Sequence, residues 1–307
     1  MVQIIIVGIA AGAAAALLFA SVISGSFASV FLFYLAPLPV LIAALGWSHL
    51  AGLIAAAFAS AMAFAMPGAF LTVVPITAFG AWWLGYLTLL ARPSPNAATT
   101  DLEWYPIGRL VLWAAVLGTV LIAAALPKFG NDVQSLQRAL RSTYEHLLQG
   151  LADQSLIEML VVVVPAAAAV FSTVTYLFNL WLAARIVRIS GRLKRPWPEV
   201  SGLALPWSAS GLLAVALVGS FLSGVVGVLS AALAASLLMA FALLGLAVLH
   251  AITRGMSARP ALVGSAYAAA LMLGWPLLAL SAVGLAEAMF GIRVRVARRR
   301  VPPSLRT

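Results

Sequence analysis

The sequence predicts an all-α fold, namely a polytopic transmembrane helix bundle of about 8–10 spans with one extracytoplasmic amphipathic helix. Hydrophobic residues make up 64% of the chain and charged residues 8%, whereas soluble domains carry roughly 25% charged residues. Apolar runs recur along the chain, most of them near the about 20 residues that cross the hydrocarbon core. These observations exclude a soluble protein and favour a single integral membrane domain over residues 1–307.

One polar stretch divides the expected membrane domain into segments. We expect the first five spans in 1–126, a periplasmic amphipathic segment in 127–157, the remaining spans in 158–292 and a basic cytoplasmic tail in 293–307. The apolar runs lie near residues 3–23, 29–46, 49–66, 69–91, 108–126, 158–184, 208–227, 230–252 and 261–291.

The two terminal runs need separate interpretation. The first has no basic residues before it and is longer than a signal-peptide core, so we expect it to be a retained first span. The last run, 261–291, is too long for one straight span and contains Trp275 and Pro276. It predicts either a tilted, kinked helix or a pair of short crossings.

The polar interruption NDVQSLQRALRSTYEHLLQGLADQS, residues 131–155, has the periodicity of an amphipathic helix. Such a helix would lie at the outer interface. It would either cover the end of the bundle or act as a lid over an outward-facing cavity. Its apolar face would consist of Val133, Leu136, Leu140, Tyr144, Leu147, Leu148 and Leu151.

Basic residues predict the orientation of the chain. The loop RIVRISGRLKRPWPE (185–199) and the tail RVRVARRR (293–300) hold most of them, and cytoplasmic loops accumulate Lys and Arg. Counting spans back from the loop places the N-terminus in the cytoplasm as well. If Arg254, Arg259 and the tail share this side, an even number of crossings follows residue 260. The net charge of +10 is explained in this way, and no nucleic acid partner is expected.

Several kinds of chemistry lack the residues that they need. The chain has no cysteine, and His49, His146 and His250 lie far apart, so no metal site and no cofactor are expected. Carboxylates are scarce in the apolar runs, where Glu158 and Glu287 stand near the edges. Without an acid/base pair, a catalytic triad or a phosphate loop, the chain is not expected to be an enzyme or a proton-driven antiporter.

The run FYLAPLPVLIAALGW (33–47) raises the question of a binding site. Its two prolines break helical hydrogen bonding, and broken helices in membranes offer carbonyls and helix ends to a solute. Asn179 is a carboxamide in an apolar run and needs a partner. The prolines can equally form a packing kink, and Asn179 can bond another helix. The candidate substrate-binding residues are Tyr34, Pro37, Pro39, Tyr176 and Asn179.

The inner loop offers a second candidate site. Arg185, Arg188 and Arg192 recur at i, i+3 and i+7, so a continued helix would present them together to lipid phosphates or to a partner. The alternative is a simple positive-inside stop. The candidate residues for partner or lipid docking are Arg185, Arg188, Arg192, Lys194 and Arg195.

Small residues in the first run predict close helix packing. Gly8 and Gly12 form a GxxxG pattern among alanines. Such residues let helix backbones approach each other, either inside the bundle or against a partner subunit.

Four segments carry a resemblance to a known family: YLAPLPV at 34–40, GW at 46–47, NLWLAARIV at 179–187 and SGRLKRPWPE at 190–199. With them the chain resembles the YybS-like family of uncharacterised bacterial predicted membrane proteins. That family is distantly similar to the substrate-binding components of energy-coupling-factor transporters. The resemblance implies a bacterial inner membrane, a small-molecule solute, and ATPase or coupling subunits as partners beside the lipid bilayer. The chain departs from the simplest such component by having more than six expected spans and no vitamin-specific motif.

Two functions remain open from the sequence. The first is a transporter-type protein that binds or moves a small solute, with energy supplied by a partner. The second is a structural or scaffold protein whose basic loop and tail dock lipid or a cytoplasmic partner.

Overall fold

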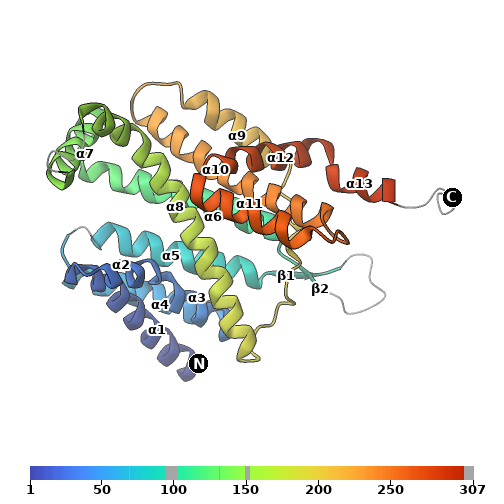
Figure 1. The fold of residues 1–307 in the computed structure, drawn as a ribbon. Coiled ribbons are helices and arrows are strands. Elements are labelled where there is room, and N and C mark those ends of the chain that lie inside the picture. Colours follow the sequence, from blue (N-terminus) through green and yellow to red (C-terminus); the bar gives the residue numbers. More distant parts are fainter. Residues whose placement is uncertain (69, 95–101, 131, 149–152, 301–307) are drawn as a thin grey trace.

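The computed structural model describes the whole chain except residues 69, 95–101, 131, 149–152 and 301–307. Within the described part the chain is almost entirely helical, which confirms the all-α bundle (Figure 1). A short antiparallel pair, β1 (Ala91–Pro93) and β2 (Leu102–Trp104), is the exception. The helices are α1 (Val2–Ala20), α2 (Phe27–Tyr34), α3 (Pro37–Gly46), α4 (His49–Met62), α5 (Phe70–Leu89), α6 (Ile107–Ala125), α7 (Val133–Leu148), α8 (Gln154–Ile189), α9 (Ser208–Gly219), α10 (Gly224–Ile252), α11 (Arg259–Leu273), α12 (Pro276–Phe290) and α13 (Ile292–Arg300).

The long helix α8 runs diagonally through the middle of the molecule, between the α1–α5 group and the α9–α12 group (Figure 1). One hydrophobic core joins α1, α3, α4 and α5 to α8, and a second joins α6, α9 and α10. Leu177 of α8 packs against both cores. The two helix groups are therefore linked through α8 and α6.

Six segments of the described chain are long and apolar enough to cross a membrane: Val2–Ser24, Phe27–Gly46, Phe70–Leu89, Ile107–Lys128, Gln154–Ile189 and Gly224–Ile252. Three shorter apolar helices, His49–Ala65, Ser208–Gly219 and Pro276–Phe290, fall in the other runs expected to span. The turn between α9 and α10 lies at residues 220–223, earlier than the expected boundary near 228–229.

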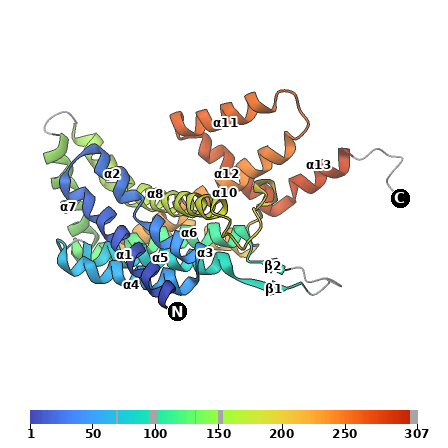
Figure 2. The same cartoon turned by 90° about the horizontal axis from the view of Figure 1, so that it is seen from below.

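The last apolar run is a pair of helices and not one kinked span. α11 ends at Leu273 and is followed by Gly274, whose φ of +70° favours glycine. Pro276 begins α12, where its fixed φ suits the first helical turn. α12 packs closely on α10. α11 projects away from the bundle in Figure 2, and none of its residues is buried.

The small residues of the first span confirm close packing, and they do so inside the bundle. A Cβ added to Gly8 would lie 2.7 Å from Cβ of Ile54, and one added to Gly12 would lie 2.6 Å from the carbonyl oxygen of Ala55. α1 and α4 can therefore approach each other only because these positions lack side chains.

The basic loop and the start of the tail lie at one end of the molecule. Arg254 at the end of α10 and Arg293 of α13 both donate hydrogen bonds to Ser201 in the loop. Arg293 also pairs with Glu287 at 2.7 Å. Through Ser201, Arg293 and Glu287, these contacts bring the ends of α10 and α12 together.

α7 lies at the opposite end from β1 and β2 (Figure 1). It is a helix as predicted, with Leu136 buried and Val133, Leu140, Tyr144 and Leu148 half-buried against its neighbours. Leu147 is exposed, and the prediction for Leu151 lies outside the described residues. α7 packs against α8 and α10, so it covers this end of the bundle.

Candidate functional site

The second span is broken between Tyr34, which ends α2, and Pro37, which begins α3. A proline has no N–H, so Pro37 and Pro39 deprive two carbonyls of their helical donors. Tight turns compensate: the carbonyl of Phe33 accepts from the Ala36 amide at 3.1 Å, and that of Leu35 accepts from the Leu38 amide at 2.9 Å. The two carbonyls that the prolines leave without a helical donor are thus hydrogen-bonded within the turn.

The carbonyl of Tyr34 loses its helical donor as well, because the Leu38 amide has turned to Leu35. Asn179 of α8 supplies the replacement, since its Nδ2 donates to the Tyr34 carbonyl at 2.9 Å and to the Thr175 carbonyl at 2.8 Å. Asn179 is fully buried. The question raised by the prolines is answered here: the freed carbonyl faces a neighbouring helix. Oδ1 of Asn179 has no hydrogen-bond partner among the described residues.

Tyr176, one turn before Asn179, fixes α8 against α5. It is 2% exposed, and its hydroxyl donates to the Ile76 carbonyl at 3.3 Å. A Cβ at Gly80 would lie 2.6 Å from this hydroxyl oxygen, so the ring occupies a notch that only glycine leaves open.

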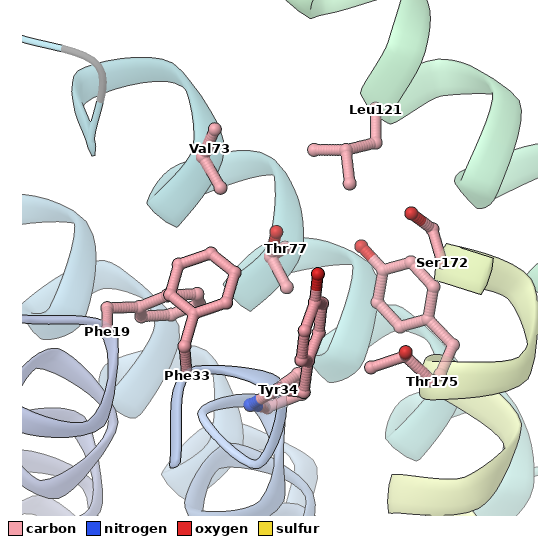
Figure 3. A pocket seen from close by; sticks show the side chains of 10 residues that line it. Phe19, Phe33, Tyr34, Val73, Thr77, Leu121, Ser172 and Thr175 are labelled. Atoms are coloured by element: carbon pink, nitrogen blue, oxygen red, sulfur yellow. The ribbon is translucent and has the colours of Figure 1, made fainter. Parts of the chain in front are cut away.

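A cavity of about 50 Å³ opens beside the break, and we call it the tyrosine cavity (Figure 3). Figure 3 shows the side chains of Tyr34, Thr77 and Ser172 converging on one space, with Leu121 of α6 opposite. The ring of Tyr34 also lies 4.7 Å from that of Phe171. The lining residues are Phe19, Phe33, Tyr34, Pro37, Val73, Thr77, Leu121, Ser172, Thr175 and Tyr176.

The structure brings part of the predicted substrate site together. Tyr34, Pro37 and Tyr176 line the tyrosine cavity, whereas Pro39 and Asn179 do not. Pro39 is half-buried in α3, and Asn179 bonds the backbone beside the cavity.

Sequence reasoning missed three hydroxyl residues of the lining, Thr77, Ser172 and Thr175. Ser172 and Thr175 precede Tyr176 by four and one positions on the same helix. Hydroxyl spacing within the apolar run of α8 was the available signal.

The chemistry of the tyrosine cavity is neutral. Every polar group among its lining residues is a hydroxyl or a backbone atom, and none of these residues is ionisable near neutral pH. The cavity can therefore donate and accept hydrogen bonds, while it offers no general base near neutral pH.

The basic residues of the second candidate site do not share one surface. Arg185 and Arg188 both lie over the ring of Trp197, at 5.7 and 5.0 Å, whereas Arg192 lies 4.4 Å from the ring of Trp47. The prediction that all three share one helical face is wrong for Arg192, because α8 ends at Ile189 before the chain turns.

Lys194 and Arg195 follow in the loop. Lys194 is exposed, and Arg195 is half-buried. The Arg195 guanidinium donates to the carbonyls of Thr88 at 3.4 Å and Tyr105 at 2.9 Å, which ties the loop to the ends of α5 and β2. Burial lowers the pKa of Arg195, yet a guanidinium stays charged throughout the physiological range.

The long apolar helices of the described chain are those of a polytopic helical membrane protein. Comparison of the chain with known protein families, with curated proteins and with solved structures finds no match. The resemblance to the YybS-like family therefore stays a prediction.

Proposed function

We propose that this protein is of transporter type and binds a small, uncharged polar solute in the tyrosine cavity. The observation that carries the proposal is the convergence of hydroxyl groups beside a broken span, among apolar helices. Such groups are costly inside a membrane unless they find partners, and broken helices line the solute sites of many transporters.

The size of the cavity limits the solute. A volume of about 50 Å³ is well below the roughly 300–1,000 Å³ of drug-sized sites. The cavity therefore accepts a molecule of a few non-hydrogen atoms or the polar end of a longer one. Since no ionisable side chain other than tyrosine lines it, an uncharged hydroxyl, carbonyl or amide group is the matching chemistry.

The proposal includes an external source of energy and no catalytic step. A proton relay needs carboxylates or histidines at depth. Glu287, buried near the end of α12, is bonded to Arg293 and so is engaged in structure. The proposed energy source is a set of ATPase or coupling subunits that bind the basic end. The proposed location is a bacterial inner membrane, with both termini in the cytoplasm.

The test is identification of a solute that stays with the purified protein. The full chain is purified without denaturation, and small molecules released from it are compared by mass spectrometry with those from Thr77→Leu, whose larger side chain fills the cavity. Leu71→Ala on the exposed face of α5 is the matched control. We expect one polar metabolite to be enriched in the wild-type and control samples and lost from Thr77→Leu. Equal recovery from all three proteins, or no enriched molecule, contradicts the proposal.

The scaffold function has a specific observation in its favour. The Tyr34 carbonyl is already satisfied by Asn179, so the prolines also serve as a structural joint. In that case the exposed Arg185 and Arg188 carry the function by docking a cytoplasmic partner. The test compares two variants in cells. If Arg185→Gln/Arg188→Gln no longer recovers a partner in a pull-down and Thr77→Leu has no effect on any activity of the cell, the scaffold is favoured over the transporter.

A further inference from the structure

A second, larger cavity lies on the other side of α8, near the basic end. Its volume is about 330 Å³, and we call it the inner cavity. Its walls come from α6, α8, α10, α11 and the loop that contains Leu193, Pro196 and Val200. Apart from Thr88, Arg195 and the aromatic residues, the lining is aliphatic. A volume in the range of small-molecule sites and an apolar lining fit a hydrocarbon chain.

Trp181 and Tyr267, two exposed residues of the lining, form a rim of the inner cavity, and they come from α8 and from α11, which stands away from α8 (Figure 2). Trp181 of α8 is 52% exposed on this rim and Tyr267 of α11 is also exposed. α8 belongs to a long apolar segment, so its exposed face at Trp181 faces lipid in a membrane. Tryptophan and tyrosine are enriched where hydrocarbon meets headgroups. A lipid molecule could therefore enter from the bilayer without passing through water.

Positive charge surrounds the end of the inner cavity. Arg195 lines it and uses two of its nitrogens on the Thr88 and Tyr105 carbonyls, although a guanidinium has five N–H donors. Trp197 also lines it, and Arg185 and Arg188 are held over that ring. Three cations thus gather where an aliphatic cavity meets the polar loop.

These cations have no carboxylate partner within the described part of the chain. The carboxylates of the same end are engaged elsewhere: Glu103 pairs with Arg92, and Glu199 pairs with Arg254. Basic pockets between transmembrane helices on the cytoplasmic side bind anionic headgroups. The charge of the site is therefore complementary to a phosphate.

We propose that the inner cavity binds one anionic glycerophospholipid from the bilayer, with an acyl chain among α6, α8 and α10 and its phosphate at Arg185, Arg188 and Arg195. The apolar lining selects a lipid over a soluble phosphate, and the three cations select an anionic headgroup over a zwitterionic one. This site is distinct from the tyrosine cavity, so its test does not depend on a solute there.

The experiment measures lipid affinity of the full chain by native mass spectrometry from detergent. Phosphatidylglycerol is compared with phosphatidylcholine that carries the same acyl chains. We expect phosphatidylglycerol to bind at least about tenfold more tightly, because each arginine near a phosphate contributes roughly one factor of five. Equal affinities, or displacement of phosphatidylglycerol by an equal concentration of inorganic phosphate, would overturn the proposal.

Matched variants locate the site. Arg185→Gln/Arg188→Gln should weaken phosphatidylglycerol binding about 30-fold and phosphatidylcholine binding by a smaller factor, because the choline cation already offsets the phosphate charge. Arg138→Gln/Arg141→Gln, two arginines of α7 at the opposite end, should have no effect. The same loss from both pairs contradicts a specific site.

A further variant tests the acyl chain. Ala184→Phe places a ring in the inner cavity and should weaken both lipids at least fivefold, whereas Ala268→Phe at an exposed position of α11 outside the lining should not. Unchanged binding by Ala184→Phe would place the lipid elsewhere. If a variant does not remain monodisperse, the wild-type protein alone tests the proposal. Its preference for phosphatidylglycerol must shrink as salt is raised, since exposed charges are screened.

Discussion

Asn179 is the residue that makes the broken second span compatible with a buried position. Two prolines two residues apart would leave carbonyls exposed to lipid or to apolar side chains, at a cost for each. Local turns satisfy the carbonyls of Phe33 and Leu35, but no backbone donor from the described residues reaches the carbonyl of Tyr34. The carboxamide of Asn179 does so from a helix that lies 145 positions later in the chain. The break and this helix therefore form one structural unit.

Replacing Asn179 with leucine should destabilise the protein by about 1–2 kcal/mol, because the Tyr34 carbonyl is left without a donor in a buried site. Ser172→Ala on the same helix is the matched control, since its hydroxyl bonds the Ala168 carbonyl of its own helix. Thermal unfolding in detergent measures both variants. Equal melting temperatures for the two variants would show that the bond between Asn179 and Tyr34 adds no stability.

Prolines and composition predicted a kink or a break at these positions, whereas partners across the bundle could not be predicted. Pro37 and Pro276 each begin a new helix, as their fixed φ and missing amide dictate. The convergence of Tyr34, Pro37 and Tyr176 was also anticipated, but Thr77 was not, since its place depends on how α5 packs beside α8. The turn at 220–223 was misplaced because apolar residues continue through it.

The contact between α10 and α12 depends on two of the 24 glycines, and nothing local distinguishes them from the rest. Gly284 faces the Phe241 carbonyl, and Gly245 faces the Leu280 carbonyl, each so closely that an added Cβ would collide with backbone. Such reciprocal contact appears only once the helices are packed.

Gly284→Ala should therefore separate α12 from α10 and cost about 1–3 kcal/mol, the usual range for overpacking against backbone that cannot yield. Gly264→Ala in α11 is the control, because nothing lies within 4 Å of its added Cβ and alanine favours a helix. Thermal unfolding of both proteins tests this contact. A stable Gly284→Ala variant would mean that the two helices can move apart freely.

The N-terminus of α8 is capped by Asp153, whose carboxylate accepts from the Leu156 amide at 2.8 Å. This bond, followed by the bond from the Ser155 hydroxyl, holds the pKa of Asp153 below its usual value. Because the folded-state pKa is lowered, the stabilisation is present above the unfolded pKa and is lost as the pH falls through the folded one.

Asp153→Ala should lower the melting temperature at neutral pH, and Asp153→Asn should not, since asparagine caps a helix as well. The difference between wild type and Asp153→Ala should shrink below about pH 4, as the carboxyl group becomes protonated. Melting temperatures taken from pH 7 to pH 3 provide the measurement. A difference that stays constant over this range argues against the cap.

At the scale of the molecule, α8 separates the two cavities. It lies close against α5 at Gly80 and against α6 at Gly118, where added Cβ atoms would lie 2.6 and 2.5 Å from the hydroxyl oxygens of Tyr176 and Thr173. The tyrosine cavity reaches Thr77 of α5 and the inner cavity reaches Thr88. Eleven residues of helix separate these positions by about 16 Å. A solute in the tyrosine cavity is thus closed off from the basic end unless α8 moves.

The arrangement predicts that α7 and the loop after α8 lie on opposite sides of the membrane. The chain has no cysteine, so single cysteines can be labelled without background. Thr143→Cys on α7 and Ser190→Cys after α8 are both exposed positions. In sealed inverted vesicles a membrane-impermeant maleimide should label Ser190→Cys, and Thr143→Cys only after the vesicles are opened, because basic loops stay in the cytoplasm.

The hairpin of α11 and α12 decides the number of crossings. Each helix has 15 residues, or about 22 Å, which is less than the roughly 30 Å of hydrocarbon. We therefore expect the hairpin to enter the membrane and return without crossing it. Trp275→Cys at its tip, where Trp275 is 65% exposed, should then resist the impermeant reagent on both sides and react with a permeant one. Labelling from the side of Thr143 would instead show two complete crossings.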